Sequence, residues 1–443
     1  MASKGVTVGL VGFGTIGAGV AKVLINNHDV IAQRLGFPLD LVHVADLDLE
    51  SDRGIDLGDI RFDSDAPALV TNPDVDIVVE LVGGYDFARK LCLDGINAGK
   101  HIVTANKALL AVHGNEIFGA ASQKGVDVAF EAAVGGGIPV LRALREGLAA
   151  NEIQSLYGIL NGTTNFVLTE MERTGADFEV VLEQAQELGY AEADPTFDVE
   201  GVDAAHKLAL LTSMAFGSTL DFKSIPTEGI SQLTPLDFES AESNGYRIKL
   251  LGIAKRHVEA DGSETIESRV HPTLIPRSSM LANVDAAMNA VAIRGDAVGP
   301  TLYYGAGAGE MPTAGAVVGD LMEIAREVRR EQSGRVAPLA FPQETLKPKP
   351  LRALGDLVSR FYVRIEALDR PGVLAKITGA LGEQGVGIES IHQQGASPGE
   401  VSVPVVLWTH EVRESNMRDA LKTIDTLAEV TAASNVIRIE EDL

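Results

Sequence analysis

The stretch VTVGLVGFGTIGAGVAKVL, residues 6–24, decides the fold of the first part of the chain. Its opening residues are mostly apolar, as in a strand buried on both faces, and glycines with the spacing G-x-G-x-x-G follow. Gly12 permits a tight turn, Gly14 lets the backbone approach a pyrophosphate, and Gly17 lets the helix pack closely on the strand. Free N–H groups at the start of a helix also favour phosphate. A strand, this turn and a helix, in that order, predict a dinucleotide site.

Further apolar strand candidates follow this unit, separated by helix-like segments, at residues 39–48, 75–84, 101–107 and 126–134. Repeated strand–helix units predict an α/β fold with a doubly wound parallel sheet, which we assign as a Rossmann-type nucleotide-binding domain over residues 1–134. Ligands of such sheets lie outside the carboxyl ends of the strands. Lys107 follows one such end, and Gly83 and Gly84 follow another.

The end of the second strand bears on the choice of dinucleotide. An acid there binds the ribose hydroxyls of NAD, whereas a nearby arginine accommodates the 2'-phosphate of NADP. Asp46 or Asp48 is the candidate acid and Arg53 the candidate base, so the sequence leaves the choice open, with a slight tilt toward NAD from Asp46. The other expected cofactor contacts lie in the glycine turn and at a strand end: Phe13, Thr15, Ile16 and Thr104.

Composition excludes several classes of partner. The chain has 443 residues and a formal net charge of -25, which disfavours nucleic acid and anionic membrane surfaces and favours a small-molecule partner. Cys92 is the only cysteine, so an intrachain disulfide is impossible, and its helix-like surroundings favour a packing role. No apolar run approaches the roughly 20 residues that span a bilayer, and no signal sequence is visible, so we expect a cytoplasmic protein.

The rest of the chain predicts two further domains. We expect an α+β substrate-binding and dimerisation domain over residues 135–310, a helix returning toward the nucleotide domain over 311–340, and a proline-bearing linker over 341–360. The final block, 361–443, has the order βαββαβ of a ferredoxin-like unit. Its turn DRPGVLAKI, residues 369–377, brings N–H groups to a helix start beside an acid, as an amino-acid ligand requires. Simple loop capping fits the same turn.

An acidic stretch, GYAEADPTFDVEGVDAAHK, covers residues 189–207 and leads into the apolar LALLTSMAF. Asp203 and Lys207 are four residues apart and share one face of a helix, as a plain surface ion pair would. A helix that is apolar nearly all round is buried, so its polar first turn is expected to open into a cleft. The sequence thus favours a functional pair over a solvated one.

Six motifs together resemble the homoserine dehydrogenases, and the C-terminal block resembles the ACT regulatory domains fused to many of them. The motifs, in chain order, are VGLVGFGTIGAGV, TANKALLA, EAAVGGGIPV, LNGTTNFVL, the acidic stretch preceded by AQEL, and GAGAGEMPTA. The resemblance covers essentially the whole chain. It implies reversible hydride transfer between L-aspartate 4-semialdehyde and L-homoserine with NADPH or NADH.

The resemblance also implies roles for individual residues. Lys207 corresponds to the general acid and base, and Lys107 to a second lysine where nicotinamide and substrate meet. Such a lysine needs a pKa lowered toward about 7 to 8, which two converging lysines would give each other. Glu192 and Asp203 correspond to positions that hold the substrate. Gly189 and Gly309 correspond to glycines that line the cofactor and substrate cleft.

Three further expectations come from the same resemblance. A monovalent cation, sodium, would bind backbone oxygens of the EAAVGGGIP turn, although an ordinary helix-entry turn predicts the same glycines; the residues are Glu131, Val134, Gly136 and Ile138. The ACT domain would bind an effector, L-threonine, through residues Asp369, Gly372, Val373 and Leu374. ACT domains bind effectors between copies, so a homodimer or homotetramer is expected.

Two alternative functions remain open from the sequence. Another two-domain amino-acid oxidoreductase would keep the glycine turn but would not need GYAEADP or the pair of Asp203 and Lys207. A noncatalytic amino-acid sensor would not need Lys107 or Lys207, and both are present.

Overall fold

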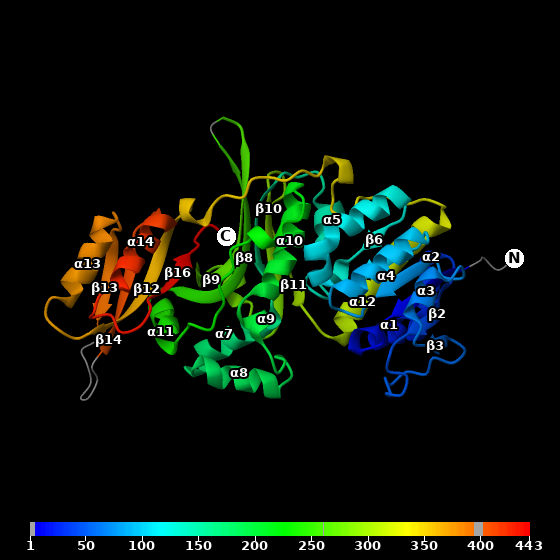
Figure 1. Cartoon of the computed structure of the whole chain (residues 1–443), viewed down its shortest axis with the longest axis horizontal. Coiled ribbons are helices and arrows are strands. Elements are labelled where there is room, and N and C mark those ends of the chain that lie inside the picture. Colours follow the sequence, from blue (N-terminus) through cyan, green and yellow to red (C-terminus); the bar gives the residue numbers. More distant parts are fainter. Residues whose placement is uncertain (1–4, 260, 394–401) are drawn as a thin grey trace. The chain divides into compact units, whose positions relative to one another are not determined.

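The computed structural model describes residues 5–259, 261–393 and 402–443. The chain divides into two compact units, each assembled from separate stretches of sequence (Figure 1). Unit 1 contains residues 1–162, 203–225 and 288–349. Unit 2 contains residues 163–202, 226–287 and 350–443.

Unit 1 is built on a six-stranded parallel sheet with the order β3-β2-β1-β4-β5-β6. The strands are β1 Val6–Val11, β2 Leu39–Ala45, β3 Arg61–Asp63, β4 Ile77–Glu80, β5 His101–Thr104 and β6 Val128–Ala129. The helices between them are α1 Thr15–Asn26, α2 His28–Leu35, α3 Ala66–Thr71, α4 Asp86–Asn97 and α5 Lys107–Lys124. This strand order confirms the predicted α/β fold.

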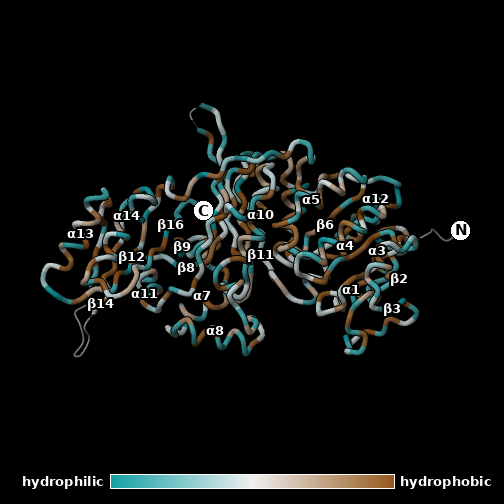
Figure 2. The backbone as a smooth tube through the Cα atoms, viewed as in Figure 1, coloured by the Kyte–Doolittle hydropathy of each residue, from teal (hydrophilic) through white to brown (hydrophobic). Residues whose placement is uncertain are grey.

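The central strands of this sheet are fully enclosed. Val8, Leu10, Ile77 and Val79 have no exposed surface. In Figure 2 brown, the hydrophobic end of the scale, recurs along the tube in the part of the chain that carries this sheet. Parallel strands covered by helices on both faces need such apolar runs, which is why the first motif reads as a continuous apolar stretch.

The glycine turn between β1 and α1 has the conformation that its spacing requires. Gly12 has φ +94°, and a Cβ there would lie 2.6 Å from the carbonyl of Leu81. A Cβ on Gly17 would lie 2.0 Å from the Gly12 oxygen, so the helix can approach the strand only with glycine there. Space is open around Gly14, which precedes the first residue of α1.

A second group of elements completes unit 1. Helix α12 Glu310–Arg329 packs on α1, where a Cβ on Gly19 would lie 3.1 Å from the Ala314 Cβ. Strands β7 Ile153–Ile159, β10 Met288–Gly295 and β11 Gly299–Ala306 pair in antiparallel fashion. Helix α10 Val202–Phe216 is buried at every position from Asp203 onward, as expected from its apolar sequence. Short helical turns fill the remainder: η1 Glu131–Ala133, α6 Val140–Arg142, η2 Ala143–Gly147, η3 Phe222–Ser224 and η5 Gln343–Thr345.

Unit 2 begins with helices and a long antiparallel pair. The helices are α7 Gly162–Thr174, α8 Phe178–Glu187, α9 Thr196–Val199 and α11 Pro235–Ser243. The pair consists of β8 Tyr246–Val258 and β9 Glu264–Pro276, and η4 Leu281–Asn283 follows. Within the described residues, no helix of the chain is long and apolar enough to cross a membrane.

The C-terminal block of unit 2 has the predicted βαββαβ order. Its elements, after the turn η6 Leu354–Asp356, are β12 Val358–Leu368, α13 Val373–Glu383, β13 Ile388–Gln393, β14 Ser402–Thr409, β15 Val412–Arg413, α14 Glu414–Ile424 and β16 Asn435–Ile439. A separate core lies between this sheet and its two helices and includes Phe361, Ile377 and Leu407. Strand β16 also pairs with β9, so the block's sheet is joined to the rest of unit 2.

Candidate active site

The first turn of α10 places a buried carboxylate among cationic side chains. Asp203 has a side chain only 5% exposed, and its Oδ2 accepts hydrogen bonds from Lys207 Nζ at 2.6 Å and from Asn161 Nδ2 at 2.8 Å. Lys107 Nζ lies 3.3 Å from the other oxygen, Oδ1. The two lysines expected to converge therefore meet at the two oxygens of one carboxylate.

Opposing effects set the charge of Asp203. Burial acts to raise the pKa of its carboxyl group, but the ammonium groups of Lys207 and Lys107 and the hydrogen bonds to the carboxylate hold that pKa well below its usual range. Asp203 is therefore a fixed negative charge at every pH at which the protein would work. It can orient both lysines without exchanging protons itself.

The two lysines differ in their surroundings. Lys207 is 10% exposed and also donates to the Leu160 carbonyl at 2.7 Å, so its ammonium is held from two sides. Lys107 is 40% exposed and lies at the first position of α5, directly after the helix-capping Asn106. One lysine is thus fixed within unit 1, and the other reaches the solvent at the carboxyl edge of the parallel sheet.

His206 lies beside this cluster and was missed from the sequence. Burial lowers the pKa of its imidazole to about 4, the nearby lysines add to that effect, and Asp203 opposes it. Its ring packs on Phe222 with the ring centres 4.1 Å apart. His206 is therefore neutral near pH 7 and contributes packing rather than a third positive charge.

The ends of β4 and β5 are connected by side chains. Thr104, an expected cofactor contact, donates its hydroxyl to Glu80 at 2.6 Å. The other Glu80 oxygen accepts the amides of Val82 and Gly83. Burial raises the pKa of Glu80, against these hydrogen bonds. Asn106 donates to the Gly84 carbonyl at 2.8 Å, so the strand ends that flank Lys107 form one rigid edge.

The cofactor candidates Asp46 and Arg53 both hold the glycine turn. Asp46 accepts the backbone N–H of Phe13, and Arg53 Nε donates to the Phe13 carbonyl at 2.8 Å. Arg53 also pairs with Asp48 at 2.9 Å. The Phe13 ring packs in the core against Phe62, so only its backbone faces the turn. Asp46, the acid expected to favour NAD, and Arg53, the base expected to favour NADP, are therefore neighbours.

The helix after Gly309 packs against α1, which begins at this turn. Gly309 has φ +120° and precedes α12, whose first residue, Glu310, pairs with Lys22 of α1 at 2.8 Å. Thr15 is exposed and Ile16 is partly buried in the first turn of α1. The structure thus brings Gly309 to the helix that begins at the dinucleotide fingerprint.

Glu192 and Gly189 belong to unit 2. Gly189 has φ +76° in the turn after α8, and the exposed Glu192 follows in a loop whose backbone accepts a hydrogen bond from Gln186 at 3.0 Å. The loop leads into α9.

The turn expected to bind a cation has a backbone conformation that favours glycine. Gly135 and Gly136 have φ +73° and +54°, and a Cβ on Gly136 would lie 2.6 Å from the Gly307 backbone. Asn289 packs against Gly307 from another side, and neither of its buried amide atoms has a hydrogen-bond partner among the described residues. An unpartnered polar group this close to the turn fits a bound ion or water. The Glu131 carboxylate instead caps the next helix by accepting from Leu141 and Arg142.

The expected effector residues lie at one end of the C-terminal block. Gly372 has φ +92° and precedes α13, and Asp369 accepts a hydrogen bond from Gln393 at 3.1 Å. Val373 is buried, whereas Leu374 is exposed. Gln393 was not singled out from the sequence.

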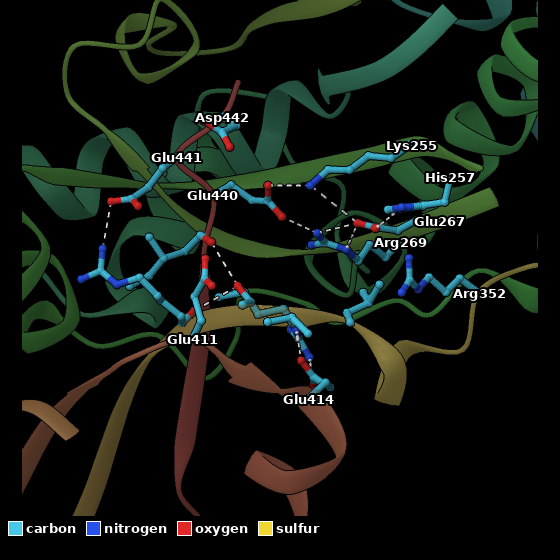
Figure 3. A pocket seen from close by; sticks show the side chains of 16 residues that line it. Lys255, His257, Glu267, Arg269, Arg352, Glu411, Glu414, Glu440, Glu441 and Asp442 are labelled. Atoms are coloured by element: carbon cyan, nitrogen blue, oxygen red, sulfur yellow. Dashed lines mark hydrogen bonds and ion pairs between the residues drawn. The ribbon is translucent and has the colours of Figure 1, made fainter. Parts of the chain in front are cut away.

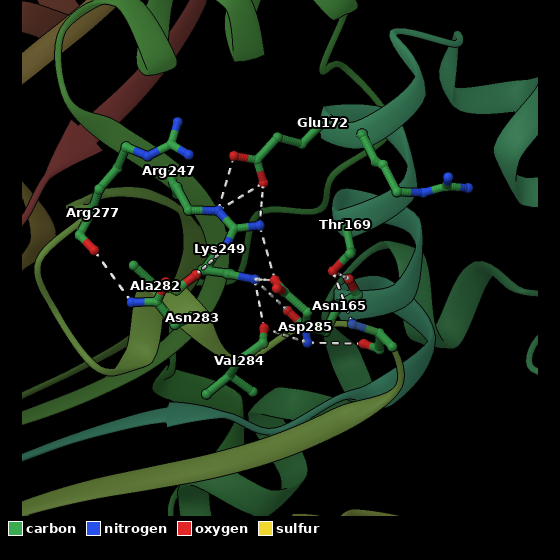
Figure 4. Close-up of polar contacts among 12 residues, drawn as sticks. Asn165, Thr169, Glu172, Arg247, Lys249, Arg277, Ala282, Asn283, Val284 and Asp285 are labelled. Atoms are coloured by element: carbon green, nitrogen blue, oxygen red, sulfur yellow. Dashed lines mark hydrogen bonds and ion pairs between the residues drawn. The ribbon is translucent and has the colours of Figure 1, made fainter.

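The motif NGTTN supplies two asparagines with different roles. Asn161 holds Asp203, whereas Asn165 donates to the carbonyls of Val284 and Ala286. Figure 4 shows Lys249 reaching the same turn, where its ammonium donates to Val284 at 2.6 Å. Burial lowers the pKa of Lys249 to about 8, with a further contribution from Arg247. A lone lysine in the apolar run IKLLGIA was the only available signal for this site.

Three family models match the chain, and together they cover most of it. The model described as homoserine dehydrogenase matches residues 139–322, and the homoserine dehydrogenase NAD-binding domain matches residues 12–131. The ACT domain model matches residues 361–429. These matches correspond to the second domain, the parallel sheet with its glycine turn, and the βαββαβ block.

Individual relatives are similar over nearly their whole length. Homoserine dehydrogenases of Pseudomonas aeruginosa and Neisseria gonorrhoeae are 50% and 47% identical, each covering 99% of both chains. The crystal structure of a homoserine dehydrogenase from Thiobacillus denitrificans is 49% identical, has a TM-score of 0.92 and covers 99% of both chains. The chain is therefore an oxidoreductase that belongs to the homoserine dehydrogenase family and carries a C-terminal ACT domain.

Proposed function

We propose that the chain interconverts L-aspartate 4-semialdehyde and L-homoserine with NADP or NAD, in the biosynthesis of threonine, methionine and isoleucine. The observation that carries this proposal is the buried Asp203 carboxylate with Lys107 and Lys207 at its two oxygens. Reduction of an aldehyde needs a proton donor for the oxygen that becomes an alkoxide. Oriented lysines beside the edge of a dinucleotide-binding sheet meet that need.

Within this reaction the nicotinamide supplies or accepts the hydride. Lys207 donates a proton to the carbonyl oxygen during reduction and removes it from the hydroxyl during oxidation. Lys107 contacts the substrate where it meets the nicotinamide. Asp203 orients both ammonium groups and holds the hydroxyl end of the substrate, and Glu192 accepts the substrate's ammonium group, in line with its place in the family motif.

The dinucleotide would lie on the glycine turn. Gly12, Gly14 and Gly17 would provide the close approach for its pyrophosphate. Gly189 and Gly309 would line the cofactor and substrate cleft, in line with their places in the family motifs. Asp46 would accept hydrogen bonds from the adenosine ribose, and Arg53 would pair with a 2'-phosphate. Because Arg53 already donates to the Phe13 carbonyl and pairs with Asp48, binding the 2'-phosphate of NADP would require its guanidinium group to share or exchange these partners.

We propose that a monovalent cation binds at the glycine turn through the carbonyl oxygens of Glu131, Val134, Gly136 and Ile138. The supporting observations are the left-handed glycines and the unpartnered Asn289 amide next to Gly307. The cation would fix the turn that connects β6 to the second domain.

The ACT domain would bind L-threonine, the end product of the pathway, at Asp369, Gly372, Val373 and Leu374. A left-handed glycine at the start of α13 presents N–H groups to a carboxylate, and Asp369 with Gln393 presents oxygens to an ammonium group. We propose a homodimer or homotetramer, in which such domains meet.

The reaction is tested by initial rates of L-homoserine oxidation at 340 nm with NAD and NADP in parallel, with and without L-threonine. Turnover with either nucleotide supports the proposed reaction, and a fall in rate with threonine supports the proposed effector. Folded protein without turnover on either nucleotide would overturn the assignment of substrate.

A further inference from the structure

The C-terminal block of unit 2, residues 361–443, is called the regulatory block, and residues 189–201 are called the substrate loop. The regulatory block contacts a short segment that precedes α11, and this segment also contacts the end of the substrate loop. We call residues 226–231 the connecting segment. It runs along β9, where Glu228 N donates to the Val270 carbonyl at 2.8 Å and Val270 N donates to Pro226 at 2.9 Å. These two bonds fix the first half of the connecting segment to β9.

Two arginines of the regulatory block hold the side chain of Glu228. Arg438 of β16 donates to both Glu228 oxygens, at 2.7 and 2.9 Å, and Arg418 of α14 donates at 2.8 Å. The Arg438 side chain is only 2% exposed. Burial acts to raise the pKa of Glu228, but the two arginines lower it, so the carboxylate stays charged.

Both arginines also hold Glu414, at the start of α14. Arg438 Nε and Arg418 Nε each donate to Glu414 at 2.8 Å. The Glu414 side chain is 2% exposed. Any rotation of α14 against β16 must therefore change the position of at least one guanidinium group that holds Glu228.

The second half of the connecting segment touches the end of α9. Ile230 N donates to the Val199 carbonyl at 2.9 Å, and Ser231 Oγ donates to Glu200 at 2.9 Å. A Cβ on Gly229 would lie 2.5 Å from the Val199 oxygen, so the two backbones are in direct contact. A shift of the connecting segment would therefore either move the end of α9 or weaken these bonds.

Helix α9 lies within the acidic stretch that carries Gly189 and Glu192, and Glu200 and Gly201 separate it from α10. Gly201 has φ +78°, and a Cβ there would lie 3.1 Å from Thr227 of the connecting segment. The chain leaving α9 is thus also held by this segment. The end of α9 and the turn after it therefore depend on where the segment lies.

The regulatory block has a second, firmer attachment to unit 2. Arg438 and Ile439 of β16 pair with Thr273 and Leu274 of β9. Figure 3 shows Glu440 between Lys255 of β8 and Arg269 of β9, with Glu267 beside them. These side chains line a polar cavity of about 300 Å³. This paired strand and its ion pairs fix the edge of the block. Only the contact at Glu228, of the two attachments described here, involves the segment that contacts the substrate loop.

We propose that Glu228 is a positioning residue through which the regulatory block sets the conformation of the substrate loop, residues 189–201. The regulatory arginines hold Glu228, Glu228 fixes the connecting segment, and the segment holds α9. Effector binding would change the positions of α14 and β16 and thereby alter the affinity for substrate, not the proton transfer. This part of the inference rests on the proposed function.

The test compares Glu228→Gln with Glu242→Gln. Glu242 is a matched control because it also pairs with an arginine at 2.8 Å within unit 2, but its side chain is 64% exposed. Because coupling contacts of this kind change free energies by 0.5–2 kcal/mol, Glu228→Gln should raise KM for L-homoserine by roughly 3- to 30-fold with little change in kcat. Amide hydrogen exchange in residues 196–201 should become faster in Glu228→Gln and not in Glu242→Gln.

Ser231→Ala provides a second variant that breaks the other end of the same link without touching a buried charge. It should change KM and hydrogen exchange in the same direction, by less. Unchanged exchange in residues 196–201 and unchanged KM in Ser231→Ala and in folded Glu228→Gln would overturn the proposal. Hydrogen exchange needs no turnover, so this result is distinguishable from failure of the proposed reaction.

The effector adds a third readout. Trp408 is the only tryptophan and lies in β14 of the regulatory block, so its fluorescence reports on that block and on its ring contact with Tyr246 of β8. In wild-type protein L-threonine should change both Trp408 fluorescence and KM. In Glu228→Gln the fluorescence change should persist while the effect on KM is reduced, and an effect on KM equal to that of the wild type would contradict the proposed route.

Discussion

Two buried carboxylates in this molecule each hold two cationic side chains, and they differ in the kind of cation. Asp203 in unit 1 is 5% exposed and holds Lys107 and Lys207, whereas Glu414 in unit 2 is 2% exposed and holds Arg418 and Arg438. A lysine can lose its proton when its surroundings change, but an arginine in a protein does not. The first cluster is thus able to move protons, and the second can only hold elements together.

Access to solvent does not separate the two clusters, because each has one buried and one exposed cation. At Asp203, Lys207 is 10% exposed and Lys107 is 40% exposed. At Glu414, Arg438 is 2% exposed and Arg418 is 50% exposed. Burial, pairing and exposure alone therefore do not mark a reactive site. The ability of the cation to exchange a proton does.

The largest expected effect tests the first cluster. Lys207→Ala should reduce kcat for L-homoserine oxidation by about 10²- to 10⁴-fold, the usual contribution of a general acid or base. Steady-state kinetics with saturating nucleotide would measure it. Binding of the nucleotide should change little.

A matched control for this variant is Lys90→Ala. Lys90 also pairs with an aspartate four residues away, Asp94, but its side chain is 63% exposed. Its removal should leave kcat within about two-fold, since exposed pairs contribute little. Equal rates for Lys207→Ala and the wild type would show that the Asp203 cluster does not carry out the proton transfer.

The second prediction tests the cluster at Glu414. Arg438→Met leaves Glu414 and Glu228 without a buried partner and should lower the free energy of unfolding by about 3–5 kcal/mol. Urea unfolding followed by Trp408 fluorescence would measure it. Arg413→Met, which removes a 63% exposed arginine 3.7 Å from Asp356, is the control and should have almost no effect.

If Arg438→Met instead abolished turnover without loss of stability, the comparison would fail. The arginine cluster would then have a role in the reaction itself, and the kind of cation would not separate the two sites.

The third prediction concerns Asp46 and Arg53, an acid and a base held by the same turn. Arg53→Ala should raise KM for NADP by about 10- to 100-fold more than KM for NAD, because a charged hydrogen bond contributes roughly 1.5–3 kcal/mol. Asp46→Ala should favour NADP over NAD. The ratio of kcat/KM for NADP to kcat/KM for NAD measures this preference in each variant. Equal changes for both nucleotides would mean that Asp46 and Arg53 do not distinguish NADP from NAD.

The smallest effect comes from a buried lysine outside both clusters. Burial lowers the pKa of Lys249 to about 8, below its value in an unfolded chain. Between the two values the unfolded chain binds a proton that the folded chain does not, so this group makes stability rise with pH from about 8 to about 10. The gain should be on the order of 1–2 kcal/mol.

Urea unfolding at pH 8 and pH 10 would measure this gain, and Lys249→Met should lack it. The same pH dependence in the variant and the wild type would mean that Lys249 does not titrate in this range.

The sequence predicted the parallel sheet, the buried α10 and the βαββαβ block because each depends on local periodicity. It also placed Lys107 and Lys207 in one site, but only through the family motifs. Spacing alone left the pair of Asp203 and Lys207 open to a surface interpretation. The burial of α10 at every position from Asp203 onward removes that interpretation.

What the sequence did not reveal depends on contacts between distant residues. Asn161 is 42 positions from Asp203, and Glu228 is 210 positions from Arg438. No local pattern marks such pairs. Lys249 was visible only as a charge within an apolar strand, and its partners come from two other elements.

The most direct test of the central claim is Lys207→Arg, assayed for L-homoserine oxidation and for stability. Arginine keeps the positive charge beside Asp203 but cannot serve as a proton acceptor. The account predicts a folded protein that binds the nucleotide and has lost at least about 10²-fold in kcat. Wild-type turnover in Lys207→Arg would contradict it, because charge alone would then suffice at this position.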